Sequence, residues 1–600
     1  MPTEGGPTRR IRVWAPYATS VHLITGSEAG QRQRQRQRQP MVPDPPTDAT
    51  SGWWSVDVPG LAHGTAYGFS LDDGEPLPDP RSVWLPDGVH ALTRHYDHDR
   101  FAWEDAGWTG RPLAGSVLYE LHVGTFTAEG TFDAAIGHLD HLVDLGVDLV
   151  ELMPVAAFDG THGWGYDGVA PWSVHEPYGG PDGLKRFVDA CHARGLGVLL
   201  DVVHNHLGPS GNYLNRYGPY ETTDHSTPWG PAVNLDRAGS DEVRAYLLGG
   251  AECLLRHFHL DGLRLDAVHA LYDDRALSFL EELSTVVAAL AAELGRPLSL
   301  VAESDRNDPR LVAPVEEHGL GITAQWDDDV HHSVHALLTG ERQGYYADFG
   351  ALSTLGHALS AAFVHAGTWS TFRGRTHGRP VDRATTPGHR FVVAVQTHDQ
   401  VGNRAQGERI GQLVPAGLAE IGAALVLTSV FTPMLFMGEE WGASTPWQFF
   451  TSFPDADTGA RVTDGRRAEF ATHGWTDTDV PDPQDPSTRA ASVLDWAEVG
   501  RQPHARLHAW YRALIALRRA EPDLRDPRLD TVDVRTDESA RWLVMARGGF
   551  RVVVNLAEEP QVVPVTAPVG RVVLTSGTAE PLPGGLRLAG RSVAVVQVSG

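Results

Sequence analysis

Apolar and polar residues follow two different periodicities in the middle of the chain. Short apolar segments with the length of buried strands recur there: Val117–His122, Leu149–Met153, Gly197–Asp201, Gly262–Asp266, Leu298–Glu303, Gly321–Gln325, Phe391–Gln396 and Pro433–Met437. Between them, apolar residues recur every three to four positions, which is typical of helices. The expected helices are Phe132–Leu145, Gly183–Arg194, Asp241–Phe258, Ala276–Leu294, Ala416–Thr428 and His504–Arg519. Because parallel strands need long connections, this alternation predicts a closed parallel barrel.

The two ends of the chain show the strict alternation of half-buried strands instead. The expected strands at the N-terminal end are Ile11–Pro16, Ser20–Ile24, Trp53–Val58 and Ala66–Leu71. Those at the C-terminal end are Arg541–Ala546, Phe550–Asn555, Arg571–Thr575 and Ser592–Val598. The predicted fold class is therefore α/β, a (β/α)8 barrel flanked by N-terminal and C-terminal β-sandwich domains.

We expect three domains with boundaries near residues 95 and 522. Residues 1–95 form the N-terminal sandwich, 96–522 the catalytic barrel and 523–600 the C-terminal sandwich. The barrel carries two irregular insertions, one after the third strand over 206–237 and one after the eighth over about 440–486. The repeat Gln31–Gln39, which alternates Gln and Arg, is expected to be a solvated, poorly ordered hairpin loop.

Composition and charge narrow the classes of partner. Hydrophobic residues make up 42% and charged residues 21% of the chain, as in folded globular proteins. The net charge of −27 opposes binding to nucleic acid or to an anionic membrane. No apolar run is long enough to span a membrane, and the first residues show no charged-then-apolar signal, so a cytoplasmic location is expected.

Carboxylates follow directly after several of the predicted strands. They occur in Asp201–His206, Gly262–Ala267, Val301–Asp305 and Gln396–Gln400, each time with a histidine, arginine or second acid nearby. In a parallel barrel the carboxyl ends of the strands meet on one face. Acids gathered there can stabilise and attack a positively charged sugar ring, so the pattern indicates glycosidic chemistry.

The neighbours of each acid suggest different roles. Strand alternation puts Arg264 and Asp266 on one face, and the guanidinium keeps the pKa of the carboxyl low, as a nucleophile requires. A structural ion pair lining the barrel is the open alternative. Glu303, after an apolar run and near other acids, suits a general acid. Asp399 follows His398 and could stabilise positive charge on the sugar. Asp201, with Asn205 and His206, binds a sugar or holds the loop in place.

The run Trp326–His332 contains three acids and two histidines. A metal site would need a further cluster of ligands at suitable spacing, which the sequence lacks. We therefore expect no metal and no cofactor, and we expect Asp328, Asp329 and His331 to form a polar wall of a sugar cleft. The loop from Asp327 to Phe349 would then shape one end of this cleft.

In order and spacing, the four acid-bearing stretches resemble the sequence regions that mark the α-amylase family of glycoside hydrolases and transferases. Tyr119–Phe126 and Gly163–Val169 extend this resemblance over most of the chain. It implies a (β/α)8 barrel and retention of configuration. It implies these roles: nucleophile Asp266, acid/base Glu303, transition-state-stabilising acid Asp399, and helpers Arg264, His206, His398 and the stacking aromatic Tyr166.

Within this family, the N-terminal sandwich resembles that of enzymes of glycogen and maltooligosaccharide metabolism. The similarity is greatest to hydrolases that release trehalose, on the segments Glu303–Arg310, Gln325–His332, His398–Arg409 and Phe436–Pro446. It implies a maltooligosaccharide substrate that ends in trehalose and is cut at the adjoining α-1,4 bond. Further substrate contacts are expected at Trp164, Trp229, His269, Gln400, Asn403 and Arg404. A branching-type glucanotransferase and a non-catalytic sugar-binding protein are the alternatives.

Overall fold

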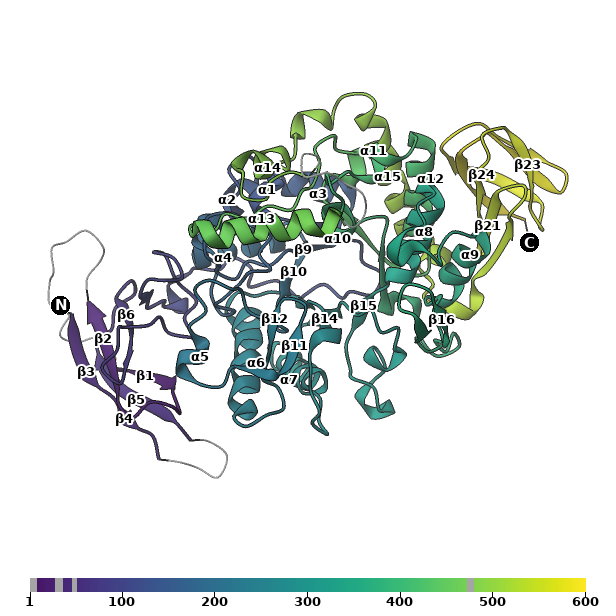
Figure 1. The fold of residues 1–600 in the computed structure, drawn as a ribbon. Coiled ribbons are helices and arrows are strands. Elements are labelled where there is room, and N and C mark those ends of the chain that lie inside the picture. The colour runs from purple at the N-terminus through teal and green to yellow at the C-terminus, as the bar shows by residue number, and fades with distance from the viewer. Residues whose placement is uncertain (1–7, 27–35, 46–50, 472–479, 600) are drawn as a thin grey trace.

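The computed structural model describes residues 8–26, 36–45, 51–471 and 480–599. Its centre is a closed barrel of parallel strands, in which each strand pairs with the next along the chain and the last pairs with the first (Figure 1). The strands are β8 (Leu118–Leu121), β9 (Leu149–Leu152), β10 (Gly197–Val202), β13 (Gly262–Leu265), β14 (Ser299–Ala302), β15 (Ala324–Trp326), β18 (Phe391–Ala394) and β19 (Thr432–Phe436). All eight lie at the segments expected from the sequence, and the predicted fold class is confirmed.

The barrel interior is apolar at one end and charged at the other. Leu118, Leu149 and Leu199 belong to an apolar cluster inside the barrel. Residues two positions further along a strand point to the same face, so Glu120 and Glu151 follow as the next inward layer. These two glutamates lie opposite each other in the register of β8 and β9, and both are almost fully buried. The charged layer thus lies toward the carboxyl ends of the strands.

Helices surround the barrel where the periodicity predicts them. They are α2 (Phe132–Ile136), α3 (Leu139–Leu145), α4 (Gly180–His192), α6 (Ser240–His257), α7 (Phe279–Leu294), α12 (Ala416–Leu427) and α15 (His504–Ala520). The single expected helix over 132–145 is two helices, because the backbone leaves the helical conformation at His138, after Gly137 has closed the first helix with a hydrogen bond from its N–H to the carbonyl of Ala134. Short helices in the loops are α1 (Val123–Phe126), α5 (Leu214–Tyr217), α10 (His398–Gly402), α11 (Ile410–Leu413), α14 (Pro486–Ala491) and α16 (Pro522–Arg525).

Two predictions about loops are wrong, and a third is wrong only at its end. The expected loop from Asp327 to Phe349 begins with α8 (Asp328–Thr339), and α9 (Leu352–Ala361) follows it. Asp327 caps α8 by accepting a hydrogen bond from the N–H of Val330. The expected irregular insertion over 440–486 contains α13 (Ala456–Ala471). The end of the Gln–Arg repeat belongs to strand β3 (Gln37–Pro40), which pairs antiparallel with β2, and is not part of a loop. The repeat up to residue 35 lies outside the described residues, so the loop expected there stays a prediction.

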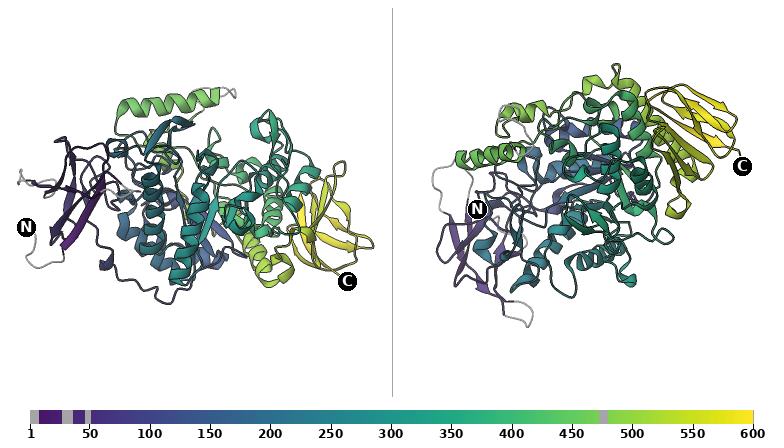
Figure 2. Two further views of the ribbon diagram at one scale, coloured as in Figure 1. Left: turned by 90° about the horizontal axis from the view of Figure 1, so that it is seen from below. Right: turned by 45° about the vertical axis from the view of Figure 1, so that its right-hand side comes forward.

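Two β modules flank the barrel at opposite ends (Figures 1 and 2). The N-terminal module has the sheets β1-β5-β4 and β3-β2-β6-β7, with the strands β1 (Thr8–Trp14), β2 (Val21–Gly26), β4 (Val42–Pro43), β5 (Trp53–Pro59), β6 (Ala66–Leu71) and β7 (Thr93–Arg94). The C-terminal module has the sheets β20-β21-β22-β27-β24 and β23-β26-β25. Its strands are β20 (Asp533–Asp537), β21 (Trp542–Arg547), β22 (Phe550–Asn555), β23 (Gln561–Pro564), β24 (Val569–Thr575), β25 (Ala579–Leu582), β26 (Gly585–Leu588) and β27 (Ser592–Val598).

Two antiparallel hairpins extend the barrel loops. They are β11 (Glu221–Thr227) with β12 (Gly230–Val233), inside the insertion after β10, and β16 (Thr368–Ser370) with β17 (Arg375–His377). Among the described residues, none of the helices combines the length and the apolar character that a membrane span requires.

Candidate active site

The side chain of Arg264, on β13, holds three carboxylates together at the carboxyl ends of the strands. It is fully buried, and its guanidinium nitrogens lie 2.7 Å from Asp201 Oδ2, 2.8 Å from Asp266 Oδ1 and 2.9 Å from Glu303 Oε2. The ring of Trp326 covers the guanidinium at 4.3 Å. Alternation on β13 points Arg264 inward, between β10 and β14, which explains why it reaches acids from all three strands.

Asp266 also accepts a hydrogen bond from the amide of Asn205, 2.7 Å from Oδ2. Its side chain remains 10% exposed. A carboxylate that is fixed by one cation and one amide, with solvent access, is oriented for attack on a ligand. A purely structural ion pair lining the barrel, the alternative left open by the sequence, would not need solvent access. The exposed edge of Asp266 therefore favours a role as the nucleophile.

Glu303 follows directly after β14. It contacts the guanidinium of Arg264 at Nη2, whereas Asp201 and Asp266 contact Nη1. The backbone N–H of Ala267 donates to Glu303 Oε2 at 2.8 Å. Burial raises the pKa of Glu303; Arg264 opposes this shift, and the nearby Asp266 and Asp399 reinforce it. A carboxyl group with a raised pKa keeps its proton near neutral pH, as a general acid must.

Asp399 and His398 begin the short helix α10, which follows β18. His398 is buried and pairs with Glu120 on β8 through Nδ1, while its backbone N–H donates to the same carboxylate at 3.1 Å. Asp399 Oδ1 lies 3.5 Å from His398 Nε2, and its side chain is 34% exposed. Burial alone would lower the pKa of His398, but Asp399 and Glu120 outweigh burial and raise the pKa to about 10. His398 therefore carries a positive charge beneath Asp399.

Tyr166 connects the acids around Arg264 with His398. Its hydroxyl donates to Asp201 Oδ2 at 2.6 Å and lies 2.9 Å from His398 Nε2, and its ring stacks on His398. Burial raises the pKa of Asp201 to about 7, although Arg264 opposes the shift. The structure thus brings Asp201 into the same network as the acids of β13 and β14 through Oδ2, while its Oδ1 has no hydrogen-bond partner among the described residues.

His206 and Trp229 lie together at the edge of the site. Their rings stack with centroids 5.0 Å apart, and His206 Nε2 lies 3.1 Å from the carbonyl oxygen of Tyr166. Trp229 follows β11 and is 51% exposed, so one face of its ring is open to a ligand. Trp164, by contrast, is buried against Trp447, and its indole N–H donates to the carbonyl of Gln448.

The residues expected in the polar wall differ in their surroundings. Asp328 begins α8, where burial and the nearby Asp329 and Asp399 raise the pKa of its carboxyl to about 7. Asp329 is buried and accepts hydrogen bonds from Asn307 and from the backbone N–H groups of Val364 and His365. These bonds favour a role in holding the loop in place over contact with a sugar.

His331 is buried among the rings of other α8 residues. His269 is half-buried, and its Nδ1 lies 4.0 Å from Asp305, two residues past Glu303. Asn403 donates to Asp399 Oδ1 at 3.4 Å, and Arg404 pairs with Glu341 at 3.0 Å.

The side chain of Gln400 completes a helix cap. It accepts hydrogen bonds from the backbone N–H of Thr397 at 2.9 Å and from its hydroxyl at 2.5 Å, while Thr397 accepts the N–H of Asp399. This reciprocal capping box fixes the start of α10. Substrate contact by Gln400 stays a prediction, but its visible role is to hold the turn that carries Asp399.

Sequence reasoning missed two buried acids. Glu120 supports His398, and Glu151 lies beside it with no hydrogen-bond partner for either carboxylate oxygen among the described residues. Burial and the neighbouring Glu120 raise the pKa of Glu151 well above its usual value, so Glu151 holds a proton. The signal was present in the sequence, because each acid interrupts an otherwise apolar strand.

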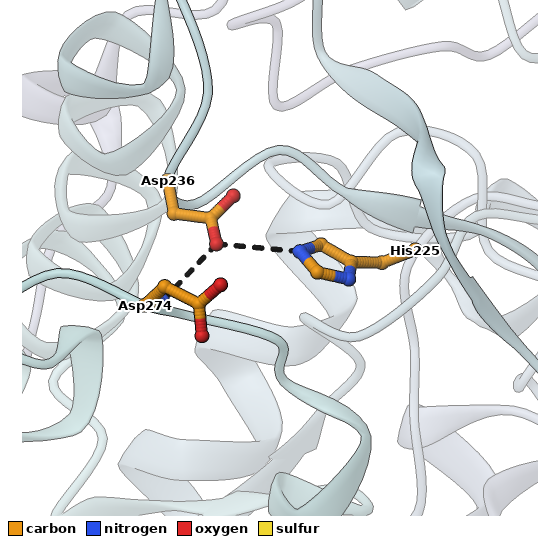
Figure 3. Close-up of side chains that lie close together, drawn as sticks. All are labelled: His225, Asp236 and Asp274. Carbon is orange, nitrogen blue, oxygen red and sulfur yellow. Dashed lines mark hydrogen bonds and ion pairs between the residues drawn. The ribbon is translucent and has the colours of Figure 1, made fainter.

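One group of side chains among the described residues has metal-ligand geometry, namely His225, Asp236 and Asp274 (Figure 3). Asp236 Oδ2 lies 3.3 Å from His225 Nε2 and accepts the N–H of Asp274 at 3.0 Å. The guanidinium of Arg237 lies 3.0 Å from the same histidine nitrogen and within 4.0 Å of both carboxylates. The cluster thus already has a cation from the chain itself.

The comparisons with known proteins agree with this geometry. Residues 96–226 match the family model of the alpha amylase catalytic domain, 2–86 that of carbohydrate-binding module 48 (isoamylase N-terminal domain) and 527–595 that of a domain of unknown function, DUF3459. The structure superposes on the crystal structure of a Salmonella typhimurium protein with a TM-score of 0.88 and 35% identity, covering 100% of this chain and 99% of that one.

Curated relatives cover nearly the whole chain. The malto-oligosyltrehalose trehalohydrolase of Mycobacterium tuberculosis is 54% identical over 94% of this chain and 95% of its own. That of Arthrobacter ramosus is 53% identical over 98% of this chain and 100% of its own. A glucan branching enzyme of Nitratidesulfovibrio vulgaris is 32% identical over 60% of this chain. These matches confirm a glycoside hydrolase that acts on an oligosaccharide, and the chain belongs to the malto-oligosyltrehalose trehalohydrolases of the α-amylase family.

Proposed function

We propose that the chain hydrolyses the α-1,4-glucosidic bond next to the trehalose end of a malto-oligosyltrehalose and releases trehalose and a maltooligosaccharide. The observation that carries the chemistry is the single guanidinium of Arg264 that contacts both Asp266 and Glu303. Carboxylates that share one guanidinium suit the roughly 5–5.5 Å separation of a retaining pair better than the roughly 6.5–9.5 Å of an inverting pair.

In this mechanism Asp266 attacks the anomeric carbon of the glucose joined to trehalose. Protonated Glu303 donates its proton to the glycosidic oxygen, and trehalose leaves. Glu303, now a base, takes a proton from a water molecule, which attacks the same carbon and frees Asp266. Asp399 stabilises the positive charge on the ring, with the His398 imidazolium fixing its position. The exposed face of Trp229 stacks against a sugar.

Product analysis tests the proposal. We expect the purified protein to release trehalose from malto-oligosyltrehalose, and Asp266→Asn, which keeps the size of the side chain, to release none above background. Plain amylose serves as the comparison substrate and yields no branched product. Branched product from amylose would indicate the glucanotransferase, and full activity of Asp266→Asn would refute the assigned nucleophile. We also propose that the protein acts in the cytoplasm.

A further inference from the structure

A pocket separate from the candidate active site lies where the N-terminal module meets the barrel. Its volume is about 430 Å³, within the range of roughly 300–1,000 Å³ that holds small ligands. We call it the junction pocket. Its walls come from β6, from the segment that leads through β7 to the barrel, from Trp172 and from α6. Figure 1 shows the purple N-terminal sheets on the side of the barrel where α5 and α6 lie.

Two histidines of the junction pocket each keep a buried ring nitrogen without a hydrogen-bond partner among the described residues, His95 at Nε2 and His98 at Nδ1. Arg81 and His257 also line the pocket. The Arg81 guanidinium lies 5.1 Å from the centre of Trp53 and 5.2 Å from that of Trp172, and His98 stacks on His257 at 4.5 Å. Polar side chains in a partly buried wall are normally paired, so the two unpaired histidine nitrogens indicate a ligand.

The sign of the charge identifies the ligand's chemistry. Two other arginines that line the pocket are already paired, Arg94 with Asp87 at 2.9 Å and Arg256 with Glu252 at 2.9 Å. Arg81 has no such salt bridge to a described residue: the nearby Asp79 accepts its backbone N–H at 2.9 Å, and burial raises the pKa of that carboxyl, so Asp79 offsets the charge of the guanidinium only in part. Burial lowers the pKa of His98 to about 3, so its ring is neutral and offers one N–H donor.

We propose that the junction pocket binds a small phosphorylated sugar. Arg81 pairs with the phosphate, because a planar guanidinium presents two parallel N–H groups to an oxyanion. His95 and His98 donate further hydrogen bonds to it. The ring of Trp172 forms an apolar wall against which the sugar packs. The site is independent of the acids that bind and cut the oligosaccharide.

Isothermal titration calorimetry on the full chain tests the proposal, with glucose 6-phosphate, inorganic phosphate and glucose as probes. We expect glucose 6-phosphate to bind most tightly and glucose most weakly. Arg81→Gln should weaken the binding of glucose 6-phosphate about tenfold or more, since it removes a charge-assisted hydrogen bond. The matched control is Arg100→Gln, an exposed arginine near the pocket but not in its wall, which should leave the affinity within about twofold.

Because Arg81 packs among aromatic rings, its replacement can disturb the module, so circular dichroism accompanies the titration. His98→Gln provides a second variant that keeps a polar side chain, and it should weaken binding about fivefold through loss of one neutral hydrogen bond. Three results would overturn the proposal: no binding of glucose 6-phosphate at about 10 mM, equal affinity for glucose and glucose 6-phosphate, or unchanged affinity in both folded variants.

Discussion

At the scale of single residues, Glu303 has the environment of a general acid. Its carboxyl is buried beside Asp266 and Asp399, and its pKa is raised. We predict that Glu303→Gln lowers kcat about a thousandfold while KM changes little, because the amide can still accept the N–H of Ala267 but cannot donate a proton to the leaving oxygen. Steady-state kinetics on malto-oligosyltrehalose provide the measurement. Glu316→Gln, an exposed glutamate, is the control and should behave as wild type.

The pH dependence of the wild type follows from the same group. An acid must be protonated to act, so activity should persist up to the raised pKa of Glu303 and fall as the pH rises through it. An unshifted carboxyl would lose its proton near pH 4.3 and leave little activity at pH 7. A profile of kcat/KM that already declines between about pH 4 and 5 would contradict the assignment.

The two buried glutamates of the barrel interior should differ in their effect on activity when they are replaced. Glu120 and Glu151 lie opposite each other on β8 and β9, yet only Glu120 pairs with His398. We predict that Glu120→Gln lowers kcat/KM about tenfold or more, because His398 loses a carboxylate that raises its pKa and fixes its ring beneath Asp399. Glu151→Gln should change little, since Glu151 is already neutral. Equal losses in the two variants would show that any change in the barrel interior impairs the enzyme.

At the scale of elements, α10 owes its start to a capping box. We predict that Gln400→Ala lowers kcat about fivefold, because loss of a cap worth about 1 kcal/mol lets Asp399 move. Gln400→Glu keeps an acceptor for the Thr397 N–H and should restore most of the activity. If Gln400 instead binds sugar through its amide N–H, the glutamate variant will be as impaired as the alanine variant in KM, which would refute the capping role.

The elements also show how far sequence reasoning extends. Each barrel strand was predicted because an apolar run between helical segments has no other stable place than a buried parallel sheet. The acids of β13 and β14 were predicted for the same reason, since residues that end such strands share one face. Helix α8 was missed because two acids of low helix propensity, Asp328 and Asp329, begin it. The N-cap hydrogen bond of Asp327 offsets that propensity.

Contacts between distant segments could not be predicted from periodicity. Glu120 and His398 are 278 positions apart, and only the closed barrel brings β8 and α10 together. The same holds for Tyr166, whose bond to Asp201 links the loop after β9 to strand β10. The resemblance to a known family named Tyr166 and His398, but it gave no partner for either of them.

At the scale of the whole molecule, the N-terminal module is tied to the barrel by specific bonds. The indole N–H of Trp53 donates to Glu242 on α6 at 2.9 Å, and the hydroxyl of Tyr217 donates to the carbonyl of Pro78. We predict that Trp53→Phe destabilises the protein by about 1–3 kcal/mol, because the buried Glu242 loses a partner. The thermal midpoint should fall with kcat unchanged, while Tyr17→Phe, at an exposed position of the module, should alter neither.

The stereochemistry of cleavage tests the central claim most directly, because it reports on how Asp266 and Glu303 act together. Proton NMR can follow malto-oligosyltrehalose during the first turnovers, before the free reducing end equilibrates. If Asp266 forms a covalent intermediate that Glu303 helps water to resolve, the maltooligosaccharide appears first as its α-anomer, together with trehalose. Initial appearance of the β-anomer would mean a single displacement by water and would contradict the account.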